Sequence, residues 1–157
     1  MCMALPGSAS PPAVDRRRDG IARASGEAVV GMLAKGITAR QILTREAFEN
    51  AIVVASALGA SSNCPPHLIA IARHMGVEHT LEDWQRLGAD IPLLADVQPA
   101  GRFLGEGFFR AGGVPAIMRE LLQAGKLNTD VMTVTGKTLG ENLAKPVTVD
   151  REVIRPY

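Results

Sequence analysis

The chain has 157 residues, 46% of them hydrophobic and 21% charged, and a formal net charge of +1. A composition this apolar excludes a disordered chain, and the length suits a single domain with an aliphatic core. The small net charge excludes a broad basic surface for nucleic acid, and no apolar run approaches the ~20 residues that cross a bilayer.

The first third of the chain predicts an irregular lead-in and one long helix. Residues 1–13 are rich in proline, glycine and serine, which favour turns. The basic run 16–18 lies between two aspartates, which favours a solvated helix start over a nucleic-acid patch. Apolar residues recur at helical spacing over 14–35, namely at Ile21, Ala24, Ala28 and Met32.

The next part of the chain predicts two helices. Thr44 is a good N-cap for a helix that continues to Leu58 and is apolar on almost every side. A helix of this kind is buried all round, so it requires neighbours on several faces. The second helix starts at Pro65 and Pro66, has one apolar stripe, and ends before Gly76.

The remaining apolar patterns predict shorter elements. A capping-box pattern that begins at Thr80 opens a helix that ends at Gly88. The other elements are strands over 91–97 and 130–136, a helix over 112–125, and one or two helical turns over 137–144. Helices dominate and at least two strands are interleaved with them, so we predict a helix-rich α/β fold with a few strands.

Two glycine-containing stretches do not predict a nucleotide site. Gly136-Lys137-Thr138 follows an apolar run, but the phosphate-loop motif requires a glycine where Val131 stands. Gly105-Glu106-Gly107 begins a dinucleotide pattern whose third glycine position holds Arg110. We therefore expect neither stretch to bind phosphate.

The stretch GASSNCPPHLIAIARH, residues 59–74, concentrates polar groups at the start of a predicted helix. Cys64 and His67 share a helix face, but a structural zinc site needs four ligands, and a catalytic cysteine needs a base that spacing alone does not identify. Cys64 is therefore expected to be a small buried side chain. The two serines and Asn63 either cap the helix or bind a hydroxyl or carboxylate of a ligand, and His67 lies in its first turn, a usual place for a pocket.

Several long blocks resemble, in this order, the dihydroxy-acid dehydratase and sugar-acid dehydratase family: LPGSAS, ILTREAFENAIVVASALGASSNCPPHLIAIARHMGV, IPLLADVQPAGRFLGEGFFRAGGVPAIMRELL and TVTGKTLGENL. The likeness runs from about residue 3 to residue 156. Within the family, DWQRLG and QPAGRFLGE are closer to the aldonic-acid dehydratases, such as those acting on arabinonate or xylonate, than to the branched-chain biosynthetic enzymes. The resemblance implies that residues 1–157 form a single partial domain, the later part of the family's N-terminal domain, and hence an internal fragment.

The resemblance also implies an activity and its cofactors. Family members remove water from a 2,3-dihydroxy acid to give a 2-keto-3-deoxy acid. They use an iron–sulfur cluster held by three cysteines, a Mg²⁺ ion with acidic ligands and a modified lysine, and a late serine as base. Neither Cys2 nor Cys64 matches a cluster cysteine, so the resemblance places all of these groups outside this chain. It implies no catalytic residue and no metal ligand here, and the segment alone is expected to be inactive.

The substrate-pocket candidates implied by the resemblance are Ser62, Asn63 and His67. Ala60 stands where glycine is common, and it would obstruct a backbone that needs a positive φ at that position. The partners implied are a small sugar acid, the rest of the dehydratase chain and further copies in a homo-oligomer, with no nucleic acid and no membrane. With two distant cysteines and no signal-peptide pattern at the start, a cytoplasmic protein is expected.

Three other interpretations stay open. The chain could belong to a dihydroxy-acid dehydratase of branched-chain amino-acid biosynthesis, or be a non-catalytic module for binding or assembly. A short, complete dehydratase that works by other means is disfavoured, because two separated cysteines cannot hold a three-cysteine cluster.

Overall fold

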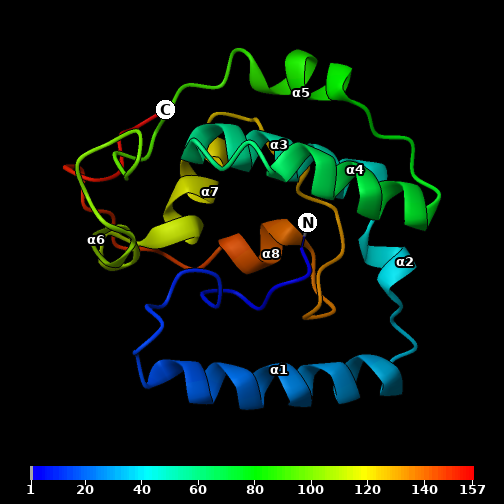
Figure 1. Cartoon of the computed structure of the whole chain (residues 1–157). Coiled ribbons are helices and arrows are strands. Elements are labelled where there is room, and N and C mark those ends of the chain that lie inside the picture. The colour runs from blue at the N-terminus through cyan, green and yellow to red at the C-terminus, as the bar shows by residue number, and fades with distance from the viewer. Residues whose placement is uncertain (1) are drawn as a thin grey trace.

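The computed structural model describes residues 2–157, and helices dominate this part of the chain (Figure 1). The long helices α3 and α4 lie above α7 and α8, with α5 over them, while α1 lies apart on the opposite side (Figure 1). The helices are α1 (Arg17–Ala34), α2 (Ala39–Ile42), α3 (Arg45–Leu58), α4 (Cys64–Met75), α5 (Leu81–Gly88), α6 (Gly105–Arg110), α7 (Gly113–Gln123) and α8 (Leu139–Leu143). The prediction of a helix-rich fold is confirmed.

The central element is α3, which packs against α4, α5 and α7. Its start is fixed by Thr44, whose side-chain oxygen accepts a hydrogen bond from the Ala47 backbone N–H at 3.4 Å. Six of its residues are buried: Ala47, Phe48, Asn50, Ile52, Val53 and Ala57. The prediction that this helix has neighbours on several faces is confirmed.

The main hydrophobic core joins α3 to the later part of the chain. Val53 and Ala57 of α3 pack in one cluster with Ile117 and Leu121 of α7, and with two short segments, 94–95 and 153–154. Each fully buried aliphatic side chain contributes about 1.5–3 kcal/mol through its removal from water. The core therefore ties the segment after α5 and the last residues of the chain to the same end of α3.

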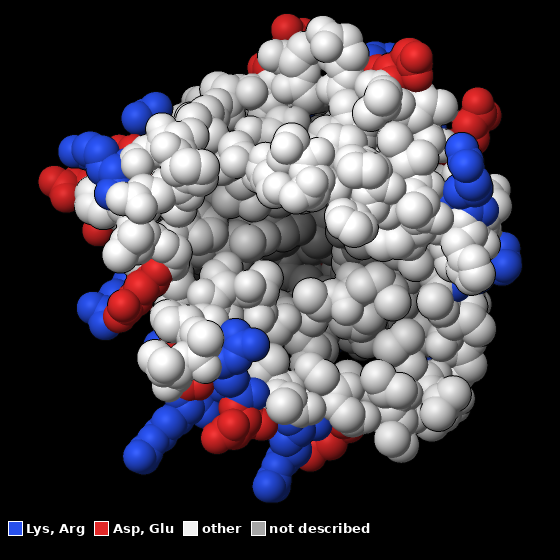
Figure 2. All heavy atoms as spheres, in the orientation of Figure 1, with Lys and Arg blue, Asp and Glu red and all other residues white. Residues whose placement is uncertain are grey.

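Helix α1 contributes little to this core. It forms over nearly the predicted range, but none of its residues is buried, and its predicted stripe, including Ile21 and Met32, is only half-buried. Figure 2 shows the molecule hollowed between α1 and the main body, with mostly uncharged atoms in the walls of the hollow. An apolar groove of about 180 Å³ lies here, lined by residues that include Met32 of α1, Ile37 and Val134.

The two predicted strands are wrong in extent. Within residues 2–157, segment 91–97 forms only isolated bridges, Ala95 with Ile154 and Val97 with Phe103, and segment 130–136 forms one bridge from Met132. The backbone hydrogen bonds of 94–96 run to the end of α3 and to the turn 150–154 instead of to a second strand. Each of these partners contributes a single isolated bridge, so no ladder propagates.

The predicted short helices begin at the capping residues that the sequence indicates. Thr80 and Asp83 form a capping box at the start of α5, and Thr138 and Glu141 form another at the start of α8. Two further short helices, α2 and α6, were not predicted. No helix in the described part of the chain combines the length and the apolar character needed to cross a membrane.

Candidate functional site

Three segments meet at the carboxyl-terminal end of α3. The Ala57 carbonyl accepts hydrogen bonds from the backbone N–H groups of Leu94 and Ala95, at 2.9 and 3.3 Å. The turn after the helix opens at Gly59, which has φ +63°, and a Cβ there would lie 2.8 Å from Cδ1 of Leu93. The turn 59–63, the start of α4 and the segment 91–97 are therefore neighbours.

The positive φ of this turn lies at Gly59 and not at the following residue. Cys2 is the only non-glycine residue with positive φ among residues 2–157. Ala60 therefore has an ordinary backbone, and the expectation that it obstructs the turn is wrong.

The three predicted pocket residues lie together at the start of α4, with exposed side chains. The Asn63 backbone N–H donates to Oγ of Ser61 at 3.2 Å, but the Asn63 side chain makes no capping bond. Within the described residues, Ser62, Asn63 and His67 form no side-chain hydrogen bond. Their polar groups are free to meet a ligand or another polypeptide, and their role stays a prediction. Cys64, expected to be buried, is half-buried.

A loop of residues 96–103, which we call the Asp96 loop, adds charge to this end of the molecule. The Asp96 carboxylate, 7% exposed, accepts hydrogen bonds from the Arg102 backbone N–H at 2.8 Å and from Arg102 Nε at 2.7 Å. Nη2 of Arg155 lies 3.9 Å from the same carboxylate. The Arg102 hydrogen bonds lower the pKa of Asp96, so the carboxylate is ionised at neutral pH.

Sequence reasoning missed this loop. Its only signal is a Pro-Ala-Gly turn between an aspartate and an arginine, inside a block that carries the family resemblance. Nothing in the spacing shows that the aspartate is buried. Nor does it show that Arg155, far along the chain, reaches the same carboxylate.

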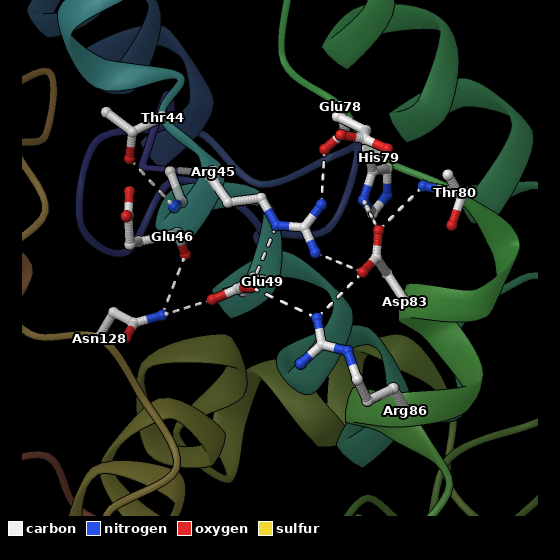
Figure 3. A network of polar contacts seen from close by, with 11 residues as sticks. Thr44, Arg45, Glu46, Glu49, Glu78, His79, Thr80, Asp83, Arg86 and Asn128 are labelled. Atoms are coloured by element: carbon white, nitrogen blue, oxygen red, sulfur yellow. Dashed lines mark hydrogen bonds and ion pairs between the residues drawn. The ribbon is translucent and has the colours of Figure 1, made fainter.

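The amino-terminal half of α3 carries a second polar cluster, drawn in Figure 3, which we call the Arg45 network: Arg45, Glu49, Asp83 and Arg86. Arg45 uses all of its side-chain nitrogens: Nε donates to Glu49 at 3.1 Å, Nη1 to the Glu78 carbonyl at 2.6 Å, and Nη2 to Asp83. Arg86 donates to Asp83 at 3.0 Å and lies 3.6 Å from Glu49. The two guanidinium groups and two carboxylates balance one another.

These contacts set the charge states around the network. The hydrogen bond from Arg45 holds the pKa of Asp83 far below its usual range, so this carboxylate stays ionised. His79 stacks on Phe48, its side chain is fully buried, and neither ring nitrogen has a hydrogen-bond partner among the described residues. Burial lowers the pKa of His79, which favours a neutral ring.

A cavity of about 320 Å³ lies beside the network, between α3, α5 and the turn 125–128. Part of its polar lining is occupied, because Asn50 exchanges two hydrogen bonds with the Asn128 backbone, at 2.9 and 2.8 Å. Glu49 and Arg86 at its rim already pair within the network.

Comparisons with known proteins agree with the sequence blocks. The dihydroxy-acid/6-phosphogluconate dehydratase N-terminal family matches residues 1–142. The chain belongs to this family. It is 61% identical over 142 residues to the dihydroxy-acid dehydratase of Acidothermus cellulolyticus, covering 90% of this chain and 25% of that relative.

Two further relatives carry the same name. The chain is 56% identical over 155 residues to the dihydroxy-acid dehydratase of a Nocardioides species, and 55% identical over 155 residues to that of Mycobacterium tuberculosis. Each match covers 98% of this chain and 27% of the relative. The chain thus spans about a quarter of the length of the curated relatives it matches.

The residues of this chain do not fit the metal groups that the family resemblance implies. The sequence has two cysteines, Cys2 against the α8 region and Cys64 at the start of α4, and a cluster needs three. No group of three or more His, Cys, Asp or Glu residues that could hold a metal ion occurs between residues 2 and 157.

Proposed function

We propose that this chain forms part of the substrate-binding region of a dihydroxy-acid dehydratase. In the reaction, the substrate loses the C3 hydroxyl and the C2 proton as water, and the resulting enol tautomerises to a 2-keto acid. The observation that carries the proposal is the identity of 55–61% to proteins of that name, over 90–98% of this chain. Conversion of the dihydroxy acid into the 2-keto acid is not required of this chain alone.

The residues proposed for substrate binding are Ser62, Asn63 and His67. Each has an exposed hydrogen-bonding side chain at the start of α4, where the helix dipole favours a bound anion. A hydroxyl, an amide and an imidazole suit the hydroxyl groups and carboxylate of a small acid. We assign no general acid or base to this chain.

The names of the relatives favour a dihydroxy acid over the aldonic acids that DWQRLG and QPAGRFLGE favoured. We therefore propose a short, branched 2,3-dihydroxy acid as the substrate class, with sugar acids as the second candidate. The proposed partner is the remainder of a dehydratase chain, assembled as an oligomer.

A segment exchange tests the proposal. Residues of this chain replace the matching 142-residue segment of the Acidothermus enzyme, giving what we call the segment-exchange enzyme. We expect it to dehydrate 2,3-dihydroxy-3-methylbutanoate, measured as the hydrazone of the 2-keto acid, faster than a five-carbon aldonic acid. A folded exchange enzyme that turns over the aldonic acid alone supports the second candidate, and one inactive on both contradicts the proposal.

A further inference from the structure

We propose that Arg102, positioned by Asp96 and assisted by Arg155, is a binding site for the carboxylate of a small hydroxy acid. The ligand class, a 2,3-dihydroxy carboxylate, rests on the proposed function. The presence of a carboxylate site does not, because it follows from the geometry of the Asp96 loop.

The first observation is that Arg102 is anchored on its inner side. Its backbone N–H and its Nε both donate to the Asp96 carboxylate, which is 7% exposed. Its guanidinium also lies 5.0 Å from the centre of the Phe103 ring. An arginine loses considerable side-chain entropy when it is held, and these contacts supply that ordering before any ligand arrives.

The second observation is that the outer side of Arg102 is free. Its side chain is 72% exposed, Nη2 makes one long contact of 3.5 Å with the Glu152 carbonyl, and Nη1 has no partner within residues 2–157. Arg45, by contrast, uses all three of its side-chain nitrogens on the protein. The free nitrogens of Arg102 present a planar donor edge of the kind that binds carboxylates.

The third observation is that the loop is built around the Asp96 carboxylate. A Cβ at Gly101 would overlap the Asp96 carbonyl carbon, its Oδ1 and the Val97 nitrogen, so only glycine allows this closure. The backbone N–H of Phe103 donates to the Asp96 carbonyl at 3.0 Å, and that of Gln98 to the Phe103 carbonyl at 2.8 Å. The loop therefore holds Arg102 in one place.

The surroundings favour an anion of modest charge. Arg155, 57% exposed, adds a second guanidinium, whose Nη2 lies 3.9 Å from the Asp96 oxygen that accepts from Arg102 Nε. Glu152 is also near, and its charge stabilises that of Arg102. The negative charges of Asp96 and Glu152 repel a multiply charged anion such as phosphate more strongly than they repel an anion with a single carboxylate. The segment that leads into the loop packs against the end of α3, and Ser62, Asn63 and His67 lie in the part of the chain that follows that end.

The test compares two exposed arginines of this chain. Arg110 is a matched control, since its side chain is 75% exposed and pairs with the exposed carboxylate of Glu106 instead of a buried one. Binding of 2,3-dihydroxy-3-methylbutanoate to the 157-residue chain is followed by amide and Arg Nε signals in NMR, against the neutral amide of the same acid and against phosphate. We expect shifts at Arg102 and its loop, and a dissociation constant raised about ten- to hundredfold by Arg102→Gln but less than about twofold by Arg110→Gln.

Kinetics of the segment-exchange enzyme give a second readout. There Arg102→Gln should raise KM about tenfold or more, with a smaller change in kcat, and Arg102→Lys should recover part of the loss. Equal binding by the Arg102→Gln and Arg110→Gln chains, or equal binding of the neutral amide or of phosphate, overturns the carboxylate site. If the exchange enzyme is inactive while the chain still binds the acid through Arg102, the proposed function fails and the site stands. If the Arg102→Gln chain does not fold, binding is measured with the folded Arg102→Lys chain instead. An affinity for the acid equal to that of the unsubstituted chain then overturns the site.

Discussion

The two ends of α3 use charged residues in opposite ways. In its amino-terminal half, the Arg45 network satisfies its charges internally, and the Asp83 carboxylate, 11% exposed, holds two guanidinium groups. At the carboxyl-terminal end, the Asp96 carboxylate is 7% exposed, but its closest partner, Arg102, is 72% exposed, compared with 33% for Arg45 beside Asp83. Burial of a carboxylate therefore does not separate structural charge from functional charge. The arginine closest to each carboxylate differs: Arg45 uses all of its side-chain nitrogens on the protein, whereas Nη1 of Arg102 has no partner within residues 2–157.

The first way to break this comparison is to remove the carboxylate at the centre of the Arg45 network. Asp83→Ala leaves Arg45 and Arg86 without their shared acceptor, and Asp83 also caps α5 through the Thr80 N–H at 3.0 Å. We expect a loss of about 3 kcal/mol in the free energy of unfolding. Urea unfolding, followed by the fluorescence of the single tryptophan, Trp84, measures it.

Glu106→Ala is the control for that experiment. It removes a carboxylate, 56% exposed, from a surface pair with Arg110, so its cost should lie within about 0–1 kcal/mol. Equal losses in the two variants contradict a structural role for the Arg45 network.

The second change closes the space on which the Asp96 loop depends. Gly101→Ala places a methyl group against the Asp96 and Val97 backbone, so the loop must open. We expect a loss of about 1–3 kcal/mol in unfolding free energy, together with loss of the Arg102 Nε hydrogen bond in NMR spectra. Gly105→Ala, where a Cβ meets no atom within 4 Å, is the matched control. An unchanged Arg102 signal in the Gly101→Ala chain counts against a loop built on this close contact.

The third prediction concerns the pH dependence of stability that the buried His79, beside the Arg45 network, produces. The groups that face His79 are Asp83 on α5 and Arg45 and Glu49 on α3, and burial outweighs them in lowering its pKa below the ordinary value of about 6.5. Because the unfolded chain binds this proton more readily, the neutral ring's contribution is fully present above pH ~6.5. It is lost as the pH falls through the folded pKa.

Unfolding free energies measured between pH 7.5 and 5 test this sign. We expect stability to fall with a slope of at most about 1.4 kcal/mol per pH unit from this group, and His79→Phe to remove that part of the slope while keeping the stack on Phe48. A slope that survives in the His79→Phe chain assigns the effect to other groups.

The sequence carried enough information for the elements whose causes are local. Thr44 before an apolar run, the capping box at Thr80 and the prolines at the start of α4 each act within one helical turn, so these helices form as predicted. The predictions of strands over 91–97 and 130–136 were wrong for the opposite reason. A β-ladder depends on a partner strand, which the local pattern does not reveal.

The same distinction applies to the site. Ser62, Asn63 and His67 were proposed because they lie close together along the chain at the start of a predicted helix, and their role stays a prediction. Arg155 was not found, because it lies 59 positions beyond Asp96 and reaches it only through the fold. The pairing of Arg45 with Asp83, across 38 positions, was missed for the same reason. Charge pairs distant in sequence leave no pattern that spacing can detect.

The smallest effect on folding is expected at the predicted pocket residues themselves. Asn63→Ala and His67→Ala remove exposed side chains that form no hydrogen bond within the described residues, so each should change the unfolding free energy by less than about 0.5 kcal/mol. In the segment-exchange enzyme, each should lower kcat/KM by about tenfold, the loss of one hydrogen bond to the substrate. His74→Ala, on the opposite end of α4, should change neither quantity. If His67→Ala and Asn63→Ala leave both turnover and oligomer assembly of that enzyme unchanged, the start of α4 does not face the substrate.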